Sequence, residues 1–141
     1  MSGQEILNVG FKNVDGTDFS DKMLYEAKNK NIYKRLFNLD LNSNFYNVNF
    51  NYNAIVAAGI ISPHHANPSS LEKCLNILCD SGLLIFSLND HAVENKNFMD
   101  EIFMIVDKNF EILEKTYGDH LPGIKLNSFV YVIKKLKIKK Y

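Results

Sequence analysis

The 141-residue sequence contains no tryptophan, only two cysteines, three prolines and no net charge. Two cysteines are too few for the disulfide framework of a small secreted domain, and Cys74 and Cys79 do not have the spacing of a metal-ligand pair. The balance of 16 basic and 16 acidic side chains argues against a nucleic-acid partner bound mainly through long-range charge. No apolar run approaches the roughly 20 residues of a membrane span, and residues 1–5 lack the features of a secretory signal. We therefore expect reduced thiols and a cytoplasmic protein without a membrane or nucleic-acid partner.

Hydrophobic residues make up 46% of the chain. Together with the length, this composition predicts one folded domain with a modest core, spanning residues 1–141. The one run of like charge lies at the C-terminus and comprises five lysines: Lys134, Lys135, Lys137, Lys139 and Lys140. We interpret it as a solvated strand end that protects a sheet edge, and the alternative is a weak contact with an anionic surface.

Hydrophobic periodicity and turn residues predict strands that alternate with helices. The expected helices cover residues 2–7, 20–30, 68–80 and 97–108, and the expected strands cover residues 13–17, 33–38, 54–58, 83–87, 110–117 and 128–138. Strands separated by helices form a mostly parallel sheet with helices on both faces. The last two strands have no helix between them, so they should pair antiparallel. The predicted fold class is α/β, with a Rossmann-like sheet and a terminal antiparallel pair.

Asp18 is the first candidate site residue, because it follows a short strand and precedes a helix that begins at Ser20. A carboxylate at the carboxyl end of a strand in an α/β nucleotide-binding unit can accept hydrogen bonds from a ribose. The alternative is an acid without a ligand, since Asp is common around helix starts.

Four segments in order resemble the class I S-adenosylmethionine-dependent methyltransferases: residues 14–24, 38–41, 52–59 and 80–86. Within that family, the sequence Gly-Ile-Ile-Ser-Pro-His-His at residues 59–65 is similar to the Williams–Beuren syndrome region methyltransferase-like group, and so is the Leu-Pro-Gly turn at residues 121–123. The resemblance extends from about residue 2 to residue 136. It implies a transferase that uses S-adenosylmethionine and, as its partner, a small-molecule methyl acceptor.

The resemblance also implies the contacts of the cofactor. Asp18 would bind the ribose hydroxyls and Phe19 would pack on the adenine. Asp40 would accept from the adenine amine, with Leu41 in the same pocket. Ala58 and Gly59 would border the methionine moiety. The resemblance implies neither a catalytic side chain nor a metal site.

The sequence departs from the family pattern at its start, because it has no counterpart of the glycine-rich loop or of the strand that leads into it. That strand would lie between the strands that end at Asp18 and at Ala58. We therefore expect an N-terminally truncated domain with little or no cofactor binding by these 141 residues. A degenerate, non-catalytic binding domain is the alternative function. A nicotinamide-dependent enzyme is disfavoured by the antiparallel ending.

His64 and His65 follow the buried strand at residues 54–58, where a substrate would lie. A role as a base or as a substrate contact is one interpretation. The other is a pair of loop histidines without a catalytic role, since no third partner has ligand spacing.

Overall fold

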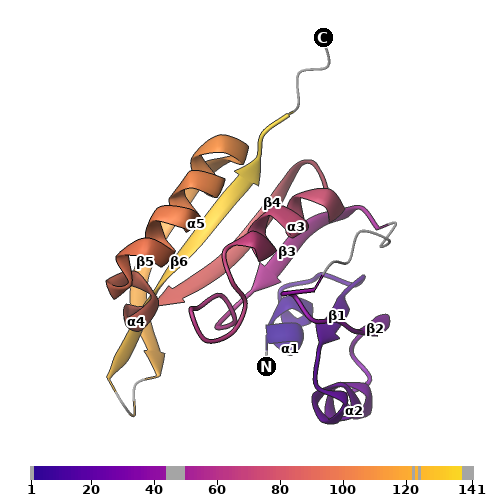
Figure 1. The fold of residues 1–141 in the computed structure, drawn as a ribbon. Coiled ribbons are helices and arrows are strands. Elements are labelled where there is room, and N and C mark those ends of the chain that lie inside the picture. The colour runs from indigo at the N-terminus through magenta and orange to yellow at the C-terminus, as the bar shows by residue number, and fades with distance from the viewer. Residues whose placement is uncertain (1, 44–49, 122, 124, 138–141) are drawn as a thin grey trace. The chain divides into compact units, whose positions relative to one another are not determined.

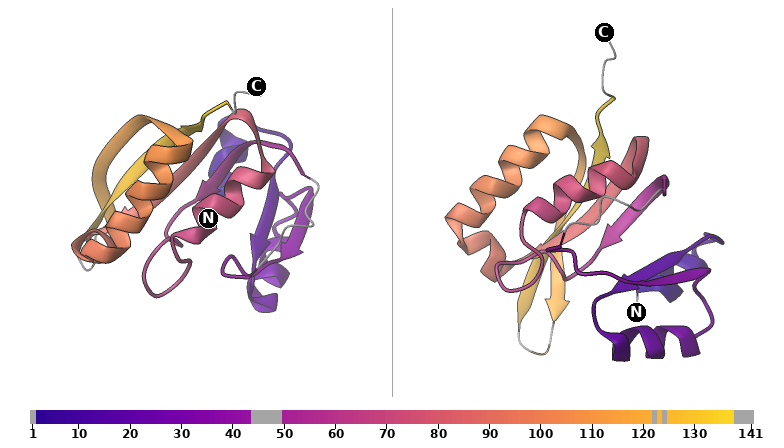
Figure 2. Two further views of the ribbon diagram at one scale, coloured as in Figure 1. Left: turned by 45° about the horizontal axis from the view of Figure 1, so that its top comes forward. Right: turned by 45° about the vertical axis from the view of Figure 1, so that its right-hand side comes forward.

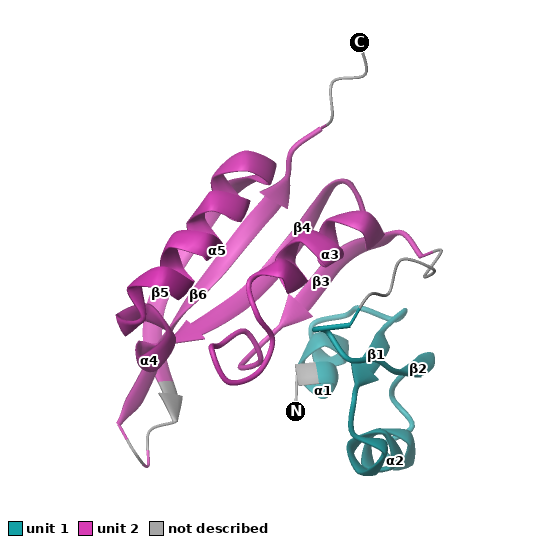
Figure 3. Cartoon of the chain, viewed as in Figure 1, with its two compact units in different colours: residues 1–43 teal, residues 44–141 magenta. Residues whose placement is uncertain are grey.

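The computed structural model describes residues 2–43, 50–121, 123 and 125–137, and its chain divides into two compact units (Figure 3). Unit 1 comprises residues 1–43 and unit 2 comprises residues 44–141. Each unit contains a parallel strand pair, and unit 2 also contains an antiparallel pair at its end. The predicted α/β fold class is therefore confirmed, whereas the single domain over residues 1–141 stays a prediction.

Unit 1 is a parallel strand pair with two short helices: α1 (Ser2–Asn8), β1 (Asp15–Asp18), α2 (Asp21–Asn29) and β2 (Arg35–Asn38). Helix α2 begins where the sequence predicts, because the Ser20 hydroxyl accepts a hydrogen bond from the Met23 amide at 3.4 Å. The two strands are joined side by side by an ion pair, in which Arg35 Nη2 lies 2.6 Å from Asp15 Oδ2. No residue of α2 is buried. Polar contacts between its strands therefore stabilise unit 1 more than a buried core does.

Unit 2 is a four-stranded sheet in the order β3-β4-β6-β5 with three helices. Its elements are β3 (Tyr52–Ala57), α3 (Ser69–Ile77), β4 (Leu78–Asn89), α4 (Asp90–Glu94), α5 (Lys96–Asn109), β5 (Phe110–Leu121) and β6 (Leu126–Lys135). Strands β3 and β4 are parallel, and β6 is antiparallel to both β4 and β5. Strands β3, β4 and β5 therefore have their carboxyl ends at the same end of the sheet.

The core of unit 2 lies between this sheet and the helices α3 and α5, which cover the same face (Figures 1 and 2). In cross-strand register, Phe86 of β4 faces Tyr131 of β6, and their rings stack at 5.1 Å between centroids. The side chains of this face are at most 3% exposed: Leu84, Phe86, Leu88, Tyr131 and Ile133. The helices contribute side chains that are at most 2% exposed: Leu71, Ile102 and Val106. A buried Phe or Leu side chain of this kind contributes about 1.5–3 kcal/mol to folding.

The helix predicted over residues 68–80 ends earlier, at Ile77, and Leu78 is already extended. Leu78 pairs with Tyr52, and the next pair along the strands joins Ala54 to Leu83, so the segment between them interrupts the register. Ser81 has a φ of 62° there, in the left-handed region. Ser81 and Gly82, which directly follow the helix predicted over residues 68–80, instead lie in an irregular segment inside β4.

Lys135 does not have the solvated position that we predicted for the C-terminal lysine run. Its Nζ donates hydrogen bonds to the carbonyl oxygens of Leu75 and Leu78, at 2.6 and 2.8 Å. These carbonyls lie at the C-terminal end of α3, where a helix leaves carbonyl groups without partners and favours positive charge. Lys139 and Lys140 of the same run lie outside the described residues.

The two cysteines have different surroundings, since Cys74 of α3 is buried and Cys79 is partly exposed. Burial raises the pKa of the Cys74 thiol to about 11, because the thiolate loses its hydration. We expect Ellman's reagent near pH 8 to label Cys79 in the native protein and Cys74 only when denaturant is added. The Cys79→Ser variant should lose the native labelling, and the Cys74→Ser variant should keep it. Equal labelling of both thiols in the native protein would contradict the burial of Cys74.

Candidate functional site

Asp18 and Asp40 both lie at the carboxyl end of the parallel pair β1–β2. Asp18 is the last residue of β1, and its carbonyl oxygen accepts from the Leu39 amide at 3.0 Å, just before Asp40. Asp18 Oδ1 accepts from the Ser20 amide at 2.9 Å, which fixes the carboxylate beside the start of α2. Asp40 Oδ1 accepts from the Asn42 amide at 2.8 Å and shapes the turn after β2. Unit 1 thus brings the two predicted carboxylates to one end of its strands.

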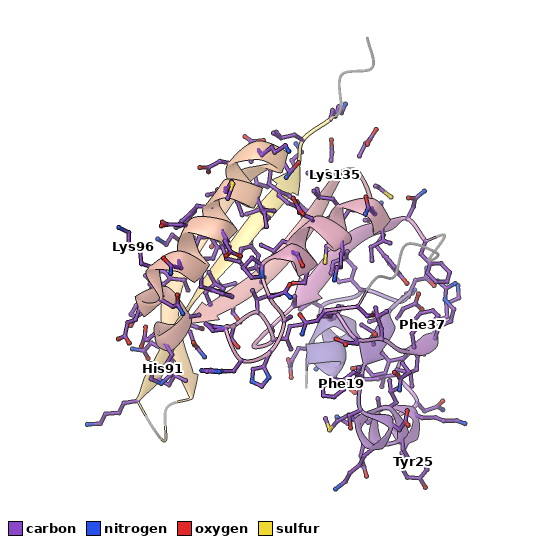
Figure 4. The ribbon with its side chains drawn as sticks, viewed as in Figure 1. Phe19, Tyr25, Phe37, His91, Lys96 and Lys135 are labelled. Atoms are coloured by element: carbon purple, nitrogen blue, oxygen red, sulfur yellow. The ribbon has the colours of Figure 1, made fainter. Side chains whose placement is uncertain are left out.

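The two apolar residues predicted for the adenine pocket follow these carboxylates in the chain. The Phe19 side chain is 74% exposed, and Figure 4 shows it at the surface of unit 1. Leu41 is half-buried. An exposed phenylalanine beside a carboxylate gives this end of unit 1 an apolar ring face next to a hydrogen-bond acceptor.

In unit 2, Ala58 and Gly59 directly follow strand β3. The Gly59 φ of 72° lies in the left-handed region, where glycine has no steric cost. The Gly59 amide donates to Ser87 Oγ at 2.8 Å. Ser87 is 7% exposed and lies near the carboxyl end of β4. The bond joins the ends of the two parallel strands, and the exposed Ala58 lies beside it.

Residues 60–66 form a loop closed by its own backbone. The Ala66 amide donates to the Ile60 carbonyl at 2.9 Å, and the Ser62 amide donates to the Ala66 carbonyl at 3.2 Å. Ile61 and Ala66 are 3% and 5% exposed and anchor the loop. His64 and His65 are exposed between these anchors. The loop thus presents the two imidazoles to solvent at the carboxyl end of β3.

A polar cluster at the same end of the sheet joins α4 to the β5–β6 hairpin. The Tyr117 hydroxyl donates to Asp90 Oδ1 at 3.0 Å, and the Asn127 amide donates to Asp90 Oδ2 at 3.1 Å. The ring centroid of Tyr117 also lies 4.6 Å from that of Phe129, its neighbour on β6. The hydrogen bond from the Tyr117 hydroxyl to Asp90 was not predicted from the sequence.

The predicted site residues therefore fall into two groups, one in each unit. Asp18, Phe19, Asp40 and Leu41 lie at the carboxyl end of β1–β2, and Ala58, Gly59, His64 and His65 lie at the carboxyl end of β3. Open α/β sheets bind ligands beyond the carboxyl ends of their strands. Within the described part of the chain, no group of three or more His, Cys, Asp or Glu side chains could hold a metal ion. Nor does any helix in that part have the length and apolar character needed to span a bilayer.

No protein-family model matches the chain, and no curated protein matches it. Solved structures do match. NodS, an N-methyltransferase of Bradyrhizobium japonicum in complex with S-adenosylhomocysteine, superposes with a TM-score of 0.71 at 11% identity, over 95% of this chain and 72% of that one. The chain has the fold of S-adenosylmethionine-dependent methyltransferases. Its fold class and its similarity to such structures agree with the resemblance seen in the sequence.

Two further structures show how varied the proteins with this fold are. The O-methyltransferase segment of StiE matches with a TM-score of 0.66 at 11% identity, over 91% of this chain and 61% of that one. An rRNA methylase of Streptococcus thermophilus matches with a TM-score of 0.59 at 18% identity, over 89% of this chain and 75% of that one. At identities this low, the likeness concerns the fold and leaves the methyl acceptor open.

Proposed function

We propose that the chain is an S-adenosylmethionine-dependent methyltransferase domain that acts on a small-molecule acceptor. The observation that carries the proposal is Asp18, a carboxylate at the carboxyl end of β1 in a fold that NodS uses to bind S-adenosylhomocysteine. Asp18 Oδ1 is held by the Ser20 amide, and Oδ2 accepts no hydrogen bond from the described residues. A fixed carboxylate with one available oxygen suits a ribose hydroxyl.

In unit 1, Phe19 and Asp40 fit the adenine of the cofactor. The exposed ring of Phe19 offers a face for the adenine, and Asp40 offers an acceptor for its amine. Gly59, with its left-handed backbone and no side chain, allows a ligand to approach the end of β3 closely. Bound S-adenosylmethionine supplies an electrophilic methyl group. Methyl transfer to an activated nucleophile needs mainly positioning, so we assign no catalytic side chain.

The proposed acceptor follows from the net charge of the chain and from the loop that carries His64 and His65. Three of the matched proteins are an N-methyltransferase, an O-methyltransferase and an rRNA methylase, so the fold is compatible with several acceptor classes. The zero net charge of the chain favours a small molecule over a nucleic acid. We assign His64 and His65 to the acceptor side, since both are exposed at the carboxyl end of β3. The likeness of their loop to the Williams–Beuren syndrome region methyltransferase-like group supports the same assignment.

S-adenosylhomocysteine titration tests the cofactor assignment. The glycine-rich turn of the family has no counterpart in these residues, so we expect weak binding, with a Kd on the order of 1 mM. Amide NMR signals of Asp18 and Phe19 in unit 1 should shift on titration. The Asp18→Ala variant should bind about tenfold to a hundredfold more weakly, as for the loss of a hydrogen bond to a charged group.

Asp21→Ala is the matched control, because Asp21 is also an acid near the start of α2 and accepts from Asn38 Nδ2 within unit 1. Its binding should equal that of the native chain. Shifts of the same size in Asp18→Ala and in the native protein would contradict the proposal. No binding of S-adenosylhomocysteine would favour the degenerate, non-catalytic binding domain.

A further inference from the structure

Ser62 is a buried serine whose hydroxyl has no hydrogen-bond partner among the described residues, although the residue is only 8% exposed. Ser70, a second buried serine, is 0% exposed, but its Oγ donates to the Asn67 carbonyl oxygen at 2.7 Å. A buried hydroxyl that lacks a partner loses the hydrogen bonds that it makes to water in the exposed state. Ser62 therefore favours a conformation of its loop in which the hydroxyl reaches water or a ligand.

Ser62 begins a tight turn between two buried anchors. Its carbonyl oxygen accepts from the His65 amide at 3.2 Å, and Pro63 has the second position of the turn, which proline favours. The Ser62 amide donates to the Ala66 carbonyl oxygen, also at 3.2 Å. Ile61 and Ala66, on either side of the turn, are 3% and 5% exposed. The turn can therefore swing outward by breaking these two hydrogen bonds, while both anchors stay buried.

We propose that the turn of residues 62–65 opens at the acceptor side of the site and presents the Ser62 hydroxyl there. Burial of an unpaired hydroxyl shifts the equilibrium towards the open turn by a factor of about five to a hundred. His64 and His65 are exposed on the same turn, so the opened turn presents all three side chains together. Because a hydroxyl both donates and accepts, it can bind a hydroxyl or an amide group of an acceptor. The assignment to the acceptor rests on the proposed function, whereas the opening itself needs no ligand.

Amide hydrogen exchange of the chain without ligand tests the opening. In the native protein, the His65 amide should exchange at least about a hundredfold faster than the amide of Phe86 in β4, because opening of the turn leaves the sheet folded. Ser62→Ala removes the unpaired hydroxyl and should slow exchange at His65 by about fivefold or more. Ser70→Ala is the matched control, because it removes a buried hydroxyl that has a partner. This control should not slow exchange at His65.

Ser62→Cys is a second variant, because a buried thiol behaves as a small apolar group and should slow the exchange as alanine does. Exchange at His65 that is unchanged or faster in both Ser62 variants overturns the proposal, because the hydroxyl then has no cost in the closed turn. A His65 amide that is as well protected as that of Phe86 also overturns it, and so does equal slowing in Ser70→Ala. The titration with S-adenosylhomocysteine tests the cofactor assignment separately, so a failure of either experiment leaves the result of the other unchanged.

Discussion

Replacing Phe86 by alanine should lower the free energy of unfolding by about 3–5 kcal/mol, the usual cost of removing a buried phenylalanine. Phe86 is 1% exposed, at the centre of the helix-covered face of the sheet. Its ring stacks on that of Tyr131 at 5.1 Å with an interplanar angle of 9°. The substitution removes both the buried area and this stacking, and it leaves a cavity under the helices. Denaturant unfolding followed by circular dichroism measures the change.

Phe19→Ala is the matched control, because it makes the same substitution at a side chain that is 74% exposed. Its effect on unfolding should stay within about 0.5 kcal/mol. The same variant should weaken the binding of S-adenosylhomocysteine, which Phe86→Ala should affect only through unfolding. Equal losses of stability in the two variants would mean that the helix-covered face of unit 2 is not the main core.

The parts of the fold and site that the sequence predicts depend on short-range signals. Ser20 begins α2, Asp18 ends β1 and Gly59 follows β3, as the sequence indicates. Each of these positions is set by a residue type with a specific backbone preference or a local hydrogen bond. The alternation of strands and helices likewise follows from apolar periodicity within each segment.

The contacts that the sequence did not predict join residues far apart in the chain. The bond between Gly59 and Ser87 spans 28 positions, and that between Asp90 and Tyr117 spans 27. Neither serine nor tyrosine in a strand carries a local signal for its partner, because the register of the sheet decides which side chains meet. A polar Ser87 at the end of the apolar run in β4 was the one available hint.

The early end of α3 has a similar cause. Leu78 continues the apolar spacing of the helix, so periodicity alone extends the helix past Ile77. In the structure Leu78 is 2% exposed and pairs with Tyr52 as the first residue of β4. Burial is available to Leu78 in either conformation, and the strand pairing decides between them.

Replacing Lys135 by methionine should lower the free energy of unfolding by about 2–3 kcal/mol, although the lysine belongs to a terminal charge run. The ammonium group, labelled in Figure 4, donates to two carbonyl oxygens at the end of α3 from a partly buried position. Methionine keeps the apolar stem and removes only the charge and the two hydrogen bonds, which leaves both carbonyls without this partner.

Lys134→Met serves as the control for Lys135→Met, because Lys134 precedes it in β6 and faces Glu111 and Leu83 of the neighbouring strands instead of α3. Cross-strand neighbours of opposite charge contribute about 0.2–1 kcal/mol, so this variant should lose clearly less stability than Lys135→Met. Chemical denaturation of both variants decides the matter. Equal losses in the free energy of unfolding would mean that Lys135 acts only as part of a diffuse positive charge. A loss in Lys135→Met alone would mean that the hydrogen bonds of this one lysine link the end of α3 to β6 and stabilise the fold.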